Sequence, residues 1–335
     1  MAIVARLFKN KWITPPKDTN EDYSRRTIII TGATSGLGKE AAYQFAALGA
    51  TKVILAARNL EKGESTKVAL EARLGRKDQL EVWELDMMSY DSVVAFAKRA
   101  TELDHLDIAI MNAGVRKIRY AQSQYGWEED LQIHTLSTTL LAILLIPKLK
   151  ESKRYTGKTP VLEFVNTGFH ETAIVPPEVR QESNVLQHYN QQENFDGGEL
   201  YRFSKVFLMY ATKKLADEIS SEDVLITSIC PGAVKTDLGR DFAAFPGYSV
   251  LTAVPFFLLF RTPVQGAKVL LSGTTQGESA HGRFWQFDVI RPVPPSLTGT
   301  AMQELGARIW DEIIEALEKD VPGVDEALDA ALRRR

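Results

Sequence analysis

The chain has 335 residues, of which 44% are hydrophobic and 25% are charged, and its formal net charge is −3 at pH 7. These values are typical of a globular protein with ample material for a core, and the small negative charge argues against general nucleic-acid binding. The one cysteine, Cys230, excludes an intramolecular disulfide and fits a reducing compartment, so we expect a cytoplasmic protein.

The first 25 residues form an N-terminal extension, and residues 1–13 are basic and mildly amphipathic. They lack the continuous apolar stretch of a secretory signal. We expect a helix that packs on the body or makes a weak membrane-surface contact, and the sequence does not decide between these. No apolar run reaches the roughly 20 residues that span a bilayer, so we predict no transmembrane segment.

Strand-like and helix-like segments alternate from Thr27 onward. We predict strands at 27–31, 52–57, 80–85, 106–111, 161–165 and 224–229, and helices at 37–48, 61–74, 91–103 and 127–149, with a further helix carrying Tyr201. Repeated β-α-β units imply a parallel sheet with helices on both faces. The predicted fold is α/β: a single doubly wound Rossmann-type domain over residues 26–300, with a parallel sheet of about seven strands.

Two irregular segments, 171–199 and 237–262, interrupt this pattern, and we predict that both lie over the substrate site. The second contains the apolar stretch 250–260, which indicates a core helix or oligomer interface, or else a lid over a lipophilic substrate. Residues 301–335 form a helical tail. Its amphipathic part, 302–317, is predicted to pack over the sheet edge or the substrate entrance.

A glycine-rich turn follows the first predicted strand, and it contains Gly32, Ser35, Gly36, Leu37 and Gly38. Glycines there permit positive φ and let the backbone approach a pyrophosphate at a helix N-terminus. The spacing Gly-x-x-x-Gly-x-Gly differs from the common dinucleotide fingerprint. Its place after a buried strand nevertheless favours a dinucleotide site over a plain tight turn.

Arg58 stands just past the second predicted strand, where the adenosine ribose should lie. NAD sites often carry a carboxylate at this place, whereas a forked guanidinium suits a 2′-phosphate. We therefore predict NADP(H) as the cofactor. Ser35 and Lys39 are candidates for additional phosphate contacts.

Tyr201 and Lys205 are four residues apart in an amphipathic run, so on a helix they share one face. A nearby cation favours the phenolate, and we expect Lys205 to lower the pKa of Tyr201 into a range useful for acid–base catalysis. Alone, such a pair is more often a solvated helix face, and the rest of the chain must decide.

Four motifs occur in order along the chain: Gly32-x-x-x-Gly36-x-Gly38, Asn112-Ala113-Gly114, Tyr201-x-x-Ser204-Lys205 and Pro231-Gly232-x-Val234-x-Thr236. Each is weak alone, but the set is specific. Over residues 25 to 290 the chain resembles the short-chain dehydrogenase/reductase superfamily, particularly its retinol-dehydrogenase-like branch and reductases of fungal biosynthetic clusters. The resemblance implies an oxidoreductase of secondary metabolism.

The resemblance also implies roles for the matching residues. Gly32, Gly36, Leu37 and Gly38 would hold the pyrophosphate, and Asp86 would bind the adenine amine. Asn112, Ala113 and Gly114 would shape the strand end beside the adenosine ribose, and Pro231, Gly232, Val234 and Thr236 would seat the nicotinamide. Family members usually form dimers or tetramers through a four-helix interface, which the helix at 127–149 and the Tyr201 helix would supply here.

Two positions depart from the family's catalytic pattern. Thr167 stands where the family has a serine that binds the substrate carbonyl, and because threonine keeps the hydroxyl we expect this function to be retained. His134 stands where the family has an asparagine, which anchors a helix distortion and a water that connects the lysine to solvent. His134 could replace it as a proton relay, be a satisfied polar residue with weakened catalysis, or contact an unusual substrate. Nearby, His170 is expected to be structural or to line the substrate site.

The function predicted from these residues is NADPH-dependent reduction of a ketone or aldehyde on a fairly apolar small molecule, or the reverse oxidation. Thr167 and Tyr201 would hydrogen-bond the carbonyl oxygen, Tyr201 would give the proton, and Lys205 would also hold the nicotinamide ribose. We predict no metal site. The alternatives are an isomerase, dehydratase or cyclase without net redox change, and a non-catalytic NADP-binding module.

Overall fold

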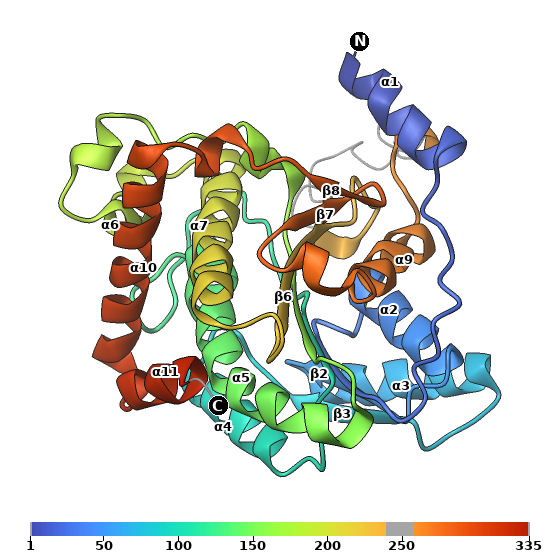
Figure 1. The fold of residues 1–335 in the computed structure, drawn as a ribbon. Helices are drawn as coiled ribbons and strands as arrows, with labels where there is room; N and C mark the ends of the chain where they lie inside the picture. Colours follow the sequence, from blue (N-terminus) through green and yellow to red (C-terminus); the bar gives the residue numbers. More distant parts are fainter. Residues whose placement is uncertain (1, 239–256, 334–335) are drawn as a thin grey trace.

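Buried, β-branched runs form the strands of a single sheet in the computed structural model, which describes residues 2–238 and 257–333. The strands are β1 Thr27–Thr31, β2 Lys52–Ala57, β3 Leu80–Glu84, β4 Ile108–Met111, β5 Val161–Val165, β6 Leu225–Cys230, β7 Phe284–Gln286 and β8 Val289–Arg291. Their spatial order is β3-β2-β1-β4-β5-β6-β7-β8. The order reverses direction at β1, which confirms the predicted doubly wound sheet (Figure 1).

One strand departs from the parallel arrangement. Strands β1 to β7 pair in parallel, whereas β8 is antiparallel to β7. Phe287 and Asp288 join the two strands, and both have φ near +57°, as a tight two-residue hairpin turn requires. The sheet therefore gains a short antiparallel edge strand beyond the predicted parallel set.

Helices cover both faces of the sheet. The α-helices are α1 Ala2–Phe8, α2 Gly36–Ala47, α3 Leu60–Leu74, α4 Tyr90–Thr101, α5 Thr138–Thr156, α6 Val185–Asn190, α7 Gly197–Glu218, α9 Pro263–Gly273, α10 Thr300–Asp320 and α11 Val324–Leu332. The π-helices are η1 Lys9–Ile13 and η2 Leu131–Ser137, and the 3-10 turns are η3 Gly168–Glu171, η4 Val179–Gln181, η5 Gln192–Asn194, η7 Gly277–Ala280 and η8 Pro295–Leu297. Helices α2 and α9 pack on one face, and α4, α5 and α7 on the other.

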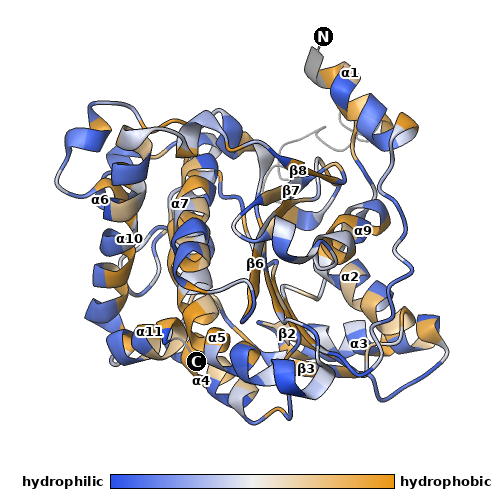
Figure 2. Cartoon of the chain, in the orientation of Figure 1, coloured by the Kyte–Doolittle hydropathy of each residue, from blue (hydrophilic) through white to orange (hydrophobic). Residues whose placement is uncertain are grey.

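The core lies between these layers, on both sides of the sheet. Figure 2 shows the central strands in the colour of hydrophobic residues, while the outer helices alternate between polar and apolar residues. The larger cluster, on the α5 and α7 side, also contains residues from α10 and α11. The C-terminal tail is thus part of the main core.

The helical run Leu131–Thr156 is long and apolar enough to cross a membrane by length and composition. However, 89% of its most apolar window is buried inside the protein, as in the core helix of a folded domain. No other helix in the described ranges passes the same test.

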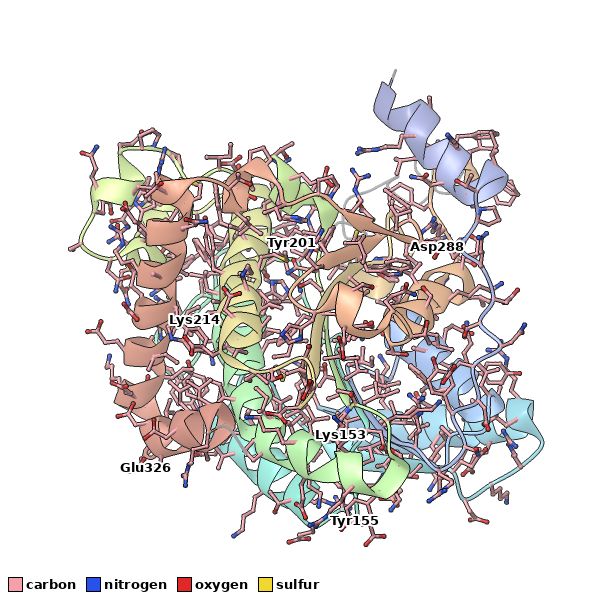
Figure 3. All side chains as sticks on the ribbon, viewed as in Figure 1. Lys153, Tyr155, Tyr201, Lys214, Asp288 and Glu326 are labelled. Carbon is pink, nitrogen blue, oxygen red and sulfur yellow. The ribbon has the colours of Figure 1, made fainter. Side chains whose placement is uncertain are left out.

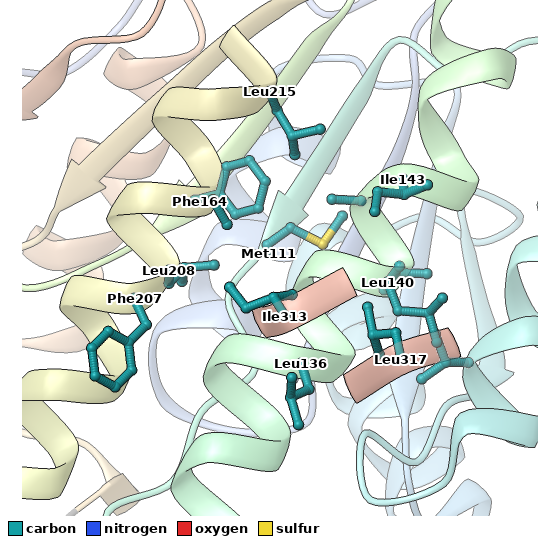
Figure 4. Packing of buried hydrophobic residues seen from close by; sticks show 14 of the residues in the cluster. Met111, Leu136, Leu140, Ile143, Phe164, Phe207, Leu208, Leu215, Ile313 and Leu317 are labelled. Carbon is teal, nitrogen blue, oxygen red and sulfur yellow. The ribbon is translucent and has the colours of Figure 1, made fainter. Parts of the chain in front are cut away.

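The C-terminal helices occupy the faces of α5 and α7 that the family resemblance assigned to subunit contact. Helix α10 packs along α7, and α11 packs on α5. Figure 4 shows Ile313 and Leu317 of α10 among Leu136, Leu140 and Leu208. The chain's own tail therefore occupies part of the surface of both helices, and the four-helix interface of a homo-oligomer stays a prediction. The tail was also expected over the sheet edge or the substrate entrance, and it lies on this helical layer instead.

The N-terminal segment packs on residues just after the undescribed stretch 239–256. Lys11 Nζ donates to the Phe257 carbonyl, Trp12 Nε1 donates to the Leu258 carbonyl at 2.8 Å, and Arg261 donates to the Asn10 carbonyl at 3.1 Å. The prediction that this segment packs on the body is confirmed by these contacts. Val4, Phe8 and Ile13 remain exposed, and a membrane contact stays a prediction.

Of the two irregular segments, the structure describes residues 171–199 fully and residues 237–262 only in part. Residues 171–199 contain η4, α6 and η5, and α6 is tied to α10 by a 2.9 Å hydrogen bond from the Leu186 N–H to Glu312. This segment is folded against the helical layer. Most of the segment 237–262, including residues 250–256 of its apolar stretch, lies outside the described residues.

Candidate active site

A cavity of about 600 Å³ opens at the carboxyl ends of β1, β2, β4, β5 and β6. In doubly wound folds this edge, next to the point where strand order reverses, is where ligands bind. Almost every residue that the sequence proposed for the cofactor or the reaction lines this cavity; the exceptions are Gly38 and Lys39. The described part of the chain therefore brings the four motifs into one site.

The glycine turn forms the floor of the cavity at the N-terminus of α2. Gly32 has φ +65° and Gly36 has φ +50°, conformations that L side chains rarely adopt. A Cβ on Gly38 would lie 2.6 Å from Asn112 Nδ2, which explains why this glycine is needed although it does not line the cavity. The turn is thus shaped by backbone that only glycine permits.

Asn112 holds this turn in place. Its Nδ2 donates to the Thr31 carbonyl at 2.8 Å, and its backbone N–H and that of Ala113 both donate to Thr31 Oγ1, at 2.9 and 2.8 Å. The end of β4 is therefore fastened to the end of β1 at the base of the cavity. This supports the structural role proposed for residues 112–114.

Arg58 lies exposed directly after β2, at the rim of the cavity. Lys62, in the first turn of α3, lines the cavity beside it, whereas Lys39 does not. The second cation near the expected 2′-phosphate is thus Lys62 and not Lys39. The sequence could have indicated Lys62, because Asn59 is a typical N-cap residue and places Lys62 in the first turn of the helix. In the structure Asn59 does cap α3, and its Oδ1 accepts a 2.7 Å hydrogen bond from the Lys62 N–H.

Asp86 also lines the cavity, two residues beyond the end of β3. Its Oδ1 accepts a 3.0 Å hydrogen bond from the Met88 N–H, and its own N–H donates to Ser92 Oγ at 2.9 Å. These bonds fix the carboxylate at the end of the cavity that Arg58 lines, where the adenosine is expected.

The opposite end of the cavity is formed by the loop after β6, which includes Pro231, Gly232, Val234 and Thr236. Cys230 precedes it and is buried. Its Sγ accepts hydrogen bonds from the Gly168 and Gly232 N–H groups at 3.3 and 3.4 Å. The thiol therefore joins this loop to the loop that carries Thr167, a link that the sequence did not reveal.

Tyr201 and Lys205 lie on the first turns of α7, and Figure 3 labels Tyr201 on this helix. Both side chains are buried, with exposed fractions of 8% and 5%. Lys205 Nζ donates to the Val165 carbonyl at the end of β5, at 2.9 Å. The Arg116 guanidinium lies over the Tyr201 ring, 5.5 Å from its centroid. Both groups face the cavity.

The pKa of Tyr201 is raised, whereas the sequence predicted that Lys205 would lower it. Burial raises the pKa of the Tyr201 phenol above its usual value, and the Cys230 thiol and Asp130 add to that shift. Arg116 is the cation that opposes it, together with a hydrogen bond to the Thr167 side chain. Burial also lowers the pKa of Lys205 to about 8. The sequence argument weighed the charge of the lysine but not the loss of water around the phenol.

Thr167 lies at the end of β5, where it caps η3, and its Oγ1 accepts a 3.3 Å hydrogen bond from the Phe169 N–H. The hydroxyl therefore lies close to Tyr201 at the wall of the cavity. His170, three residues further, does not line the cavity. It is 1% exposed and packs edge-on against Phe284, with ring centroids 4.3 Å apart, which favours the structural interpretation.

His134 lies in the middle of the π-helix η2 and is fully buried. Its Nε2 accepts a 3.0 Å hydrogen bond from the Val115 N–H, so the ring proton is on Nδ1, which lies 2.9 Å from Ser204 Oγ. The ring packs edge-on against Tyr201. Burial and the charge of Lys205 lower the pKa of His134 well below its usual value. This geometry favours a neutral, satisfied residue that joins η2 to α7.

Within residues 2–238 and 257–333, no group of three or more His, Cys, Asp or Glu side chains is arranged to hold a metal ion.

Comparison with known proteins places this fold and site among relatives. A family model described as short chain dehydrogenase matches residues 26–158. The chain is 36% identical to short-chain dehydrogenase/reductase phmF of Phaeosphaeria nodorum, covering 96% of this chain and 95% of that protein. It is 35% identical to short-chain dehydrogenase/reductase ffsI of Aspergillus flavipes, covering 94% and 92%.

Solved structures show the same fold at lower identity. A short-chain dehydrogenase from Sphingobium yanoikuyae in complex with NADPH has a TM-score of 0.57 and 20% identity, over 88% of this chain and 96% of that one. An uncharacterized protein from Mycobacterium paratuberculosis has a TM-score of 0.64 and 23% identity, over 92% and 97%.

Proposed function

The chain belongs to the short-chain dehydrogenase/reductase family, and from this premise we propose that it reduces a ketone or aldehyde of a fairly apolar small molecule with NADPH. The observation that carries the proposal is the buried group of Tyr201, Lys205 and Thr167 at the cavity wall. These residues supply two hydroxyl donors for one carbonyl oxygen and a cation behind them.

The cavity fits a dinucleotide along its length. A Cβ on Gly36 would lie 3.2 Å from the Thr236 side chain, so glycine keeps the passage between the turn and the loop after β6 open. Backbone N–H groups at the start of α2 suit a pyrophosphate. Arg58 and Lys62, both at the rim, favour a 2′-phosphate and hence NADP(H) over NAD(H). The Sphingobium yanoikuyae enzyme with a similar fold was solved with NADPH.

When bound, the nicotinamide supplies the hydride for the carbonyl carbon. The chain's own residues bind the carbonyl oxygen and transfer the proton. Thr167 and Tyr201 hold the carbonyl oxygen as negative charge develops on it, and Tyr201 gives it a proton. Lys205, held by the Val165 carbonyl, restores the proton on Tyr201.

Burial raises the pKa of the Tyr201 phenol, so we propose that the phenol keeps its proton at neutral pH and acts as the acid of the reduction. The oxidation would use the same groups in reverse.

The substrate-facing part of the cavity is mainly apolar. Leu7 of α1, Val115, Phe169, Phe260 and Phe287 line it, with Gln286 and Glu171 as polar residues. This lining suits a lipophilic carbonyl compound. We infer a role in secondary metabolism from the resemblance to reductases of fungal biosynthetic clusters, and a reducing compartment such as the cytoplasm suits the buried, free Cys230.

The test is NADPH oxidation, followed by absorbance, with a panel of lipophilic ketones, aldehydes and quinones. Tyr201→Phe removes only the hydroxyl, so we expect turnover to fall by about two to four orders of magnitude while the Kd for NADPH hardly changes. Tyr210→Phe, on the same helix and remote from the cavity, is the matched control and should retain turnover. Full activity in Tyr201→Phe would contradict the assignment.

A further inference from the structure

Each turnover of the proposed reduction takes a proton from Tyr201, and Lys205 must be resupplied to restore it. His134, at the position of the family's asparagine, is a poor source. Its Nε2 accepts from the Val115 N–H and its Nδ1 proton faces Ser204 Oγ, so both ring nitrogens are engaged. A different buried group is needed behind the lysine.

Asp130 is such a group. It immediately precedes η2, four residues before His134, and η2 packs directly against α7. Its side chain is 0% exposed, and neither carboxyl oxygen makes a hydrogen bond of normal geometry, although the Lys117 backbone N–H favours its charged form. An unsatisfied buried carboxyl is costly, which calls for an explanation in terms of function.

The charged groups around Asp130 come from three elements. The charge of Lys205 on α7 lowers the pKa of Asp130, and the charge of Asp130 raises the pKa of Lys205. The charge of Asp130 also raises the pKa of Tyr201 on the same helix. Glu128, on the same segment, is fully buried and accepts hydrogen bonds from the Asp130 and Leu131 N–H groups at 2.7 and 3.3 Å. Lys117, after β4, faces both carboxyls and pairs with Glu129 at the surface.

Burial disfavours the charged forms of the Asp130 carboxyl, the Glu128 carboxyl and the Lys205 ammonium, because all three are shielded from water. Burial and the neighbouring Glu128 raise the pKa of Asp130 to about 8, and burial raises that of Glu128 to about 7. Burial lowers the pKa of Lys205 to about 8. Burial therefore disfavours the charged forms of both Asp130 and Lys205, so the two groups compete for protons.

We propose that Asp130 is the buried proton source that resupplies Lys205 during the reduction, a role that rests on the proposed function. The Tyr201 O–H bond breaks as its proton goes to the product oxygen, and the Lys205 ammonium returns a proton to Tyr201. The Asp130 carboxyl then gives its proton to the Lys205 amine. The resulting carboxylate is then reprotonated from water. Asp130 acts through Lys205 and does not touch the reacting atoms, so it is a positioning residue.

The test is the pH profile of kcat for Asp130→Asn, which keeps the volume but cannot donate a proton. We expect kcat to fall roughly 10- to 100-fold, with the KM and the NADPH affinity nearly unchanged. The alkaline limb should move to lower pH, because Lys205 loses the carboxylate that raises its pKa. Asp130→Glu should restore the limb. Glu129→Gln, the neighbouring surface carboxylate, is the matched control and should behave as the native chain.

An Asp130→Asn enzyme with an unshifted alkaline limb would overturn the proposal, even if its kcat were lower, because it would show that Asp130 does not influence the titration of Lys205. A second measurement separates this failure from failure of the reductase assignment. The pH titration of Lys205, followed by NMR of ¹³C-labelled lysine and identified with Lys205→Arg, needs no substrate. A lower Lys205 pKa in Asp130→Asn supports the coupling, and an unchanged pKa contradicts it.

Discussion

At the adenosine end of the cavity, Arg58 is exposed and the floor is backbone held open by glycines. At the catalytic end, Tyr201, Lys205 and Asp130 are at most 8% exposed. An exposed arginine such as Arg58 stays hydrated until a phosphate binds, and its guanidinium does not exchange protons near neutral pH. Burial has the opposite result, because it shifts the pKa values of acid and base toward one another. The cavity thus separates recognition of the cofactor from control of the proton.

The largest effect should come from the packing that keeps the catalytic end dry. Ile313 of α10 is 0% exposed in the core behind α7, so Ile313→Ala should lower the free energy of unfolding by about 2–5 kcal/mol. Denaturant unfolding measures this. Val68→Ala, on the exposed face of α3, should change it by less than about 0.5 kcal/mol. Equal losses in the two variants would show that α10 adds nothing to the core.

Thr167 tests the hydroxyl at the catalytic end. Thr167→Val keeps the shape and removes the donor, so we expect kcat to fall by about 10²- to 10³-fold with the NADPH affinity retained. Thr167→Ser should keep most of the activity. Steady-state kinetics with any active carbonyl compound distinguishes the two variants, and equal rates in both would remove Thr167 from the mechanism.

Arg58 tests the opposite end. Arg58→Ala should weaken NADPH binding by about 1.5–3 kcal/mol, because a charge-assisted pair with the 2′-phosphate is lost, and should leave NADH binding unchanged. Fluorescence titration with both cofactors measures this preference. Lys39→Ala, outside the cavity, is the control. A parallel loss for NADPH and NADH would mean that Arg58 does not recognise the 2′-phosphate.

The smallest effect is expected for His134→Asn, which installs the residue usual for the family. Because burial and the charge of Lys205 hold the pKa of His134 well below its usual value, we expect the ring to be neutral near pH 7 and to contribute no limb to the profile. We expect kcat to change by less than about tenfold and the pH profile to keep its shape. Loss of a limb near neutral pH in this variant would restore the relay interpretation.

The part of the molecule that was predictable from sequence is the part whose signals are local. The run 27–31 and the glycines after it identify a buried strand and a dinucleotide turn, because β-branched residues and φ-permissive glycines act within a few positions. Arg58 follows from its place after β2 in the same way.

Other features depend on contacts between distant segments. The position of α10 and α11 over α5 and α7 could not be derived from their amphipathic pattern. Such a pattern predicts that one face of a helix is buried, but it does not identify the element that this face packs against. No motif in the sequence singles out Asp130, since only the fold shows that it is 0% exposed. The direction of the Tyr201 pKa was predicted wrongly for the same reason.

The central claim, transfer of hydride to a carbonyl with Tyr201 as the acid, is tested most directly with NADPH deuterated at nicotinamide C4. The account predicts that the product of a turned-over ketone carries one deuterium on the former carbonyl carbon, detected by mass spectrometry, and that Tyr201→Phe forms almost none. A product without deuterium, formed with no net consumption of NADPH, would contradict the account and indicate an isomerisation, dehydration or cyclisation.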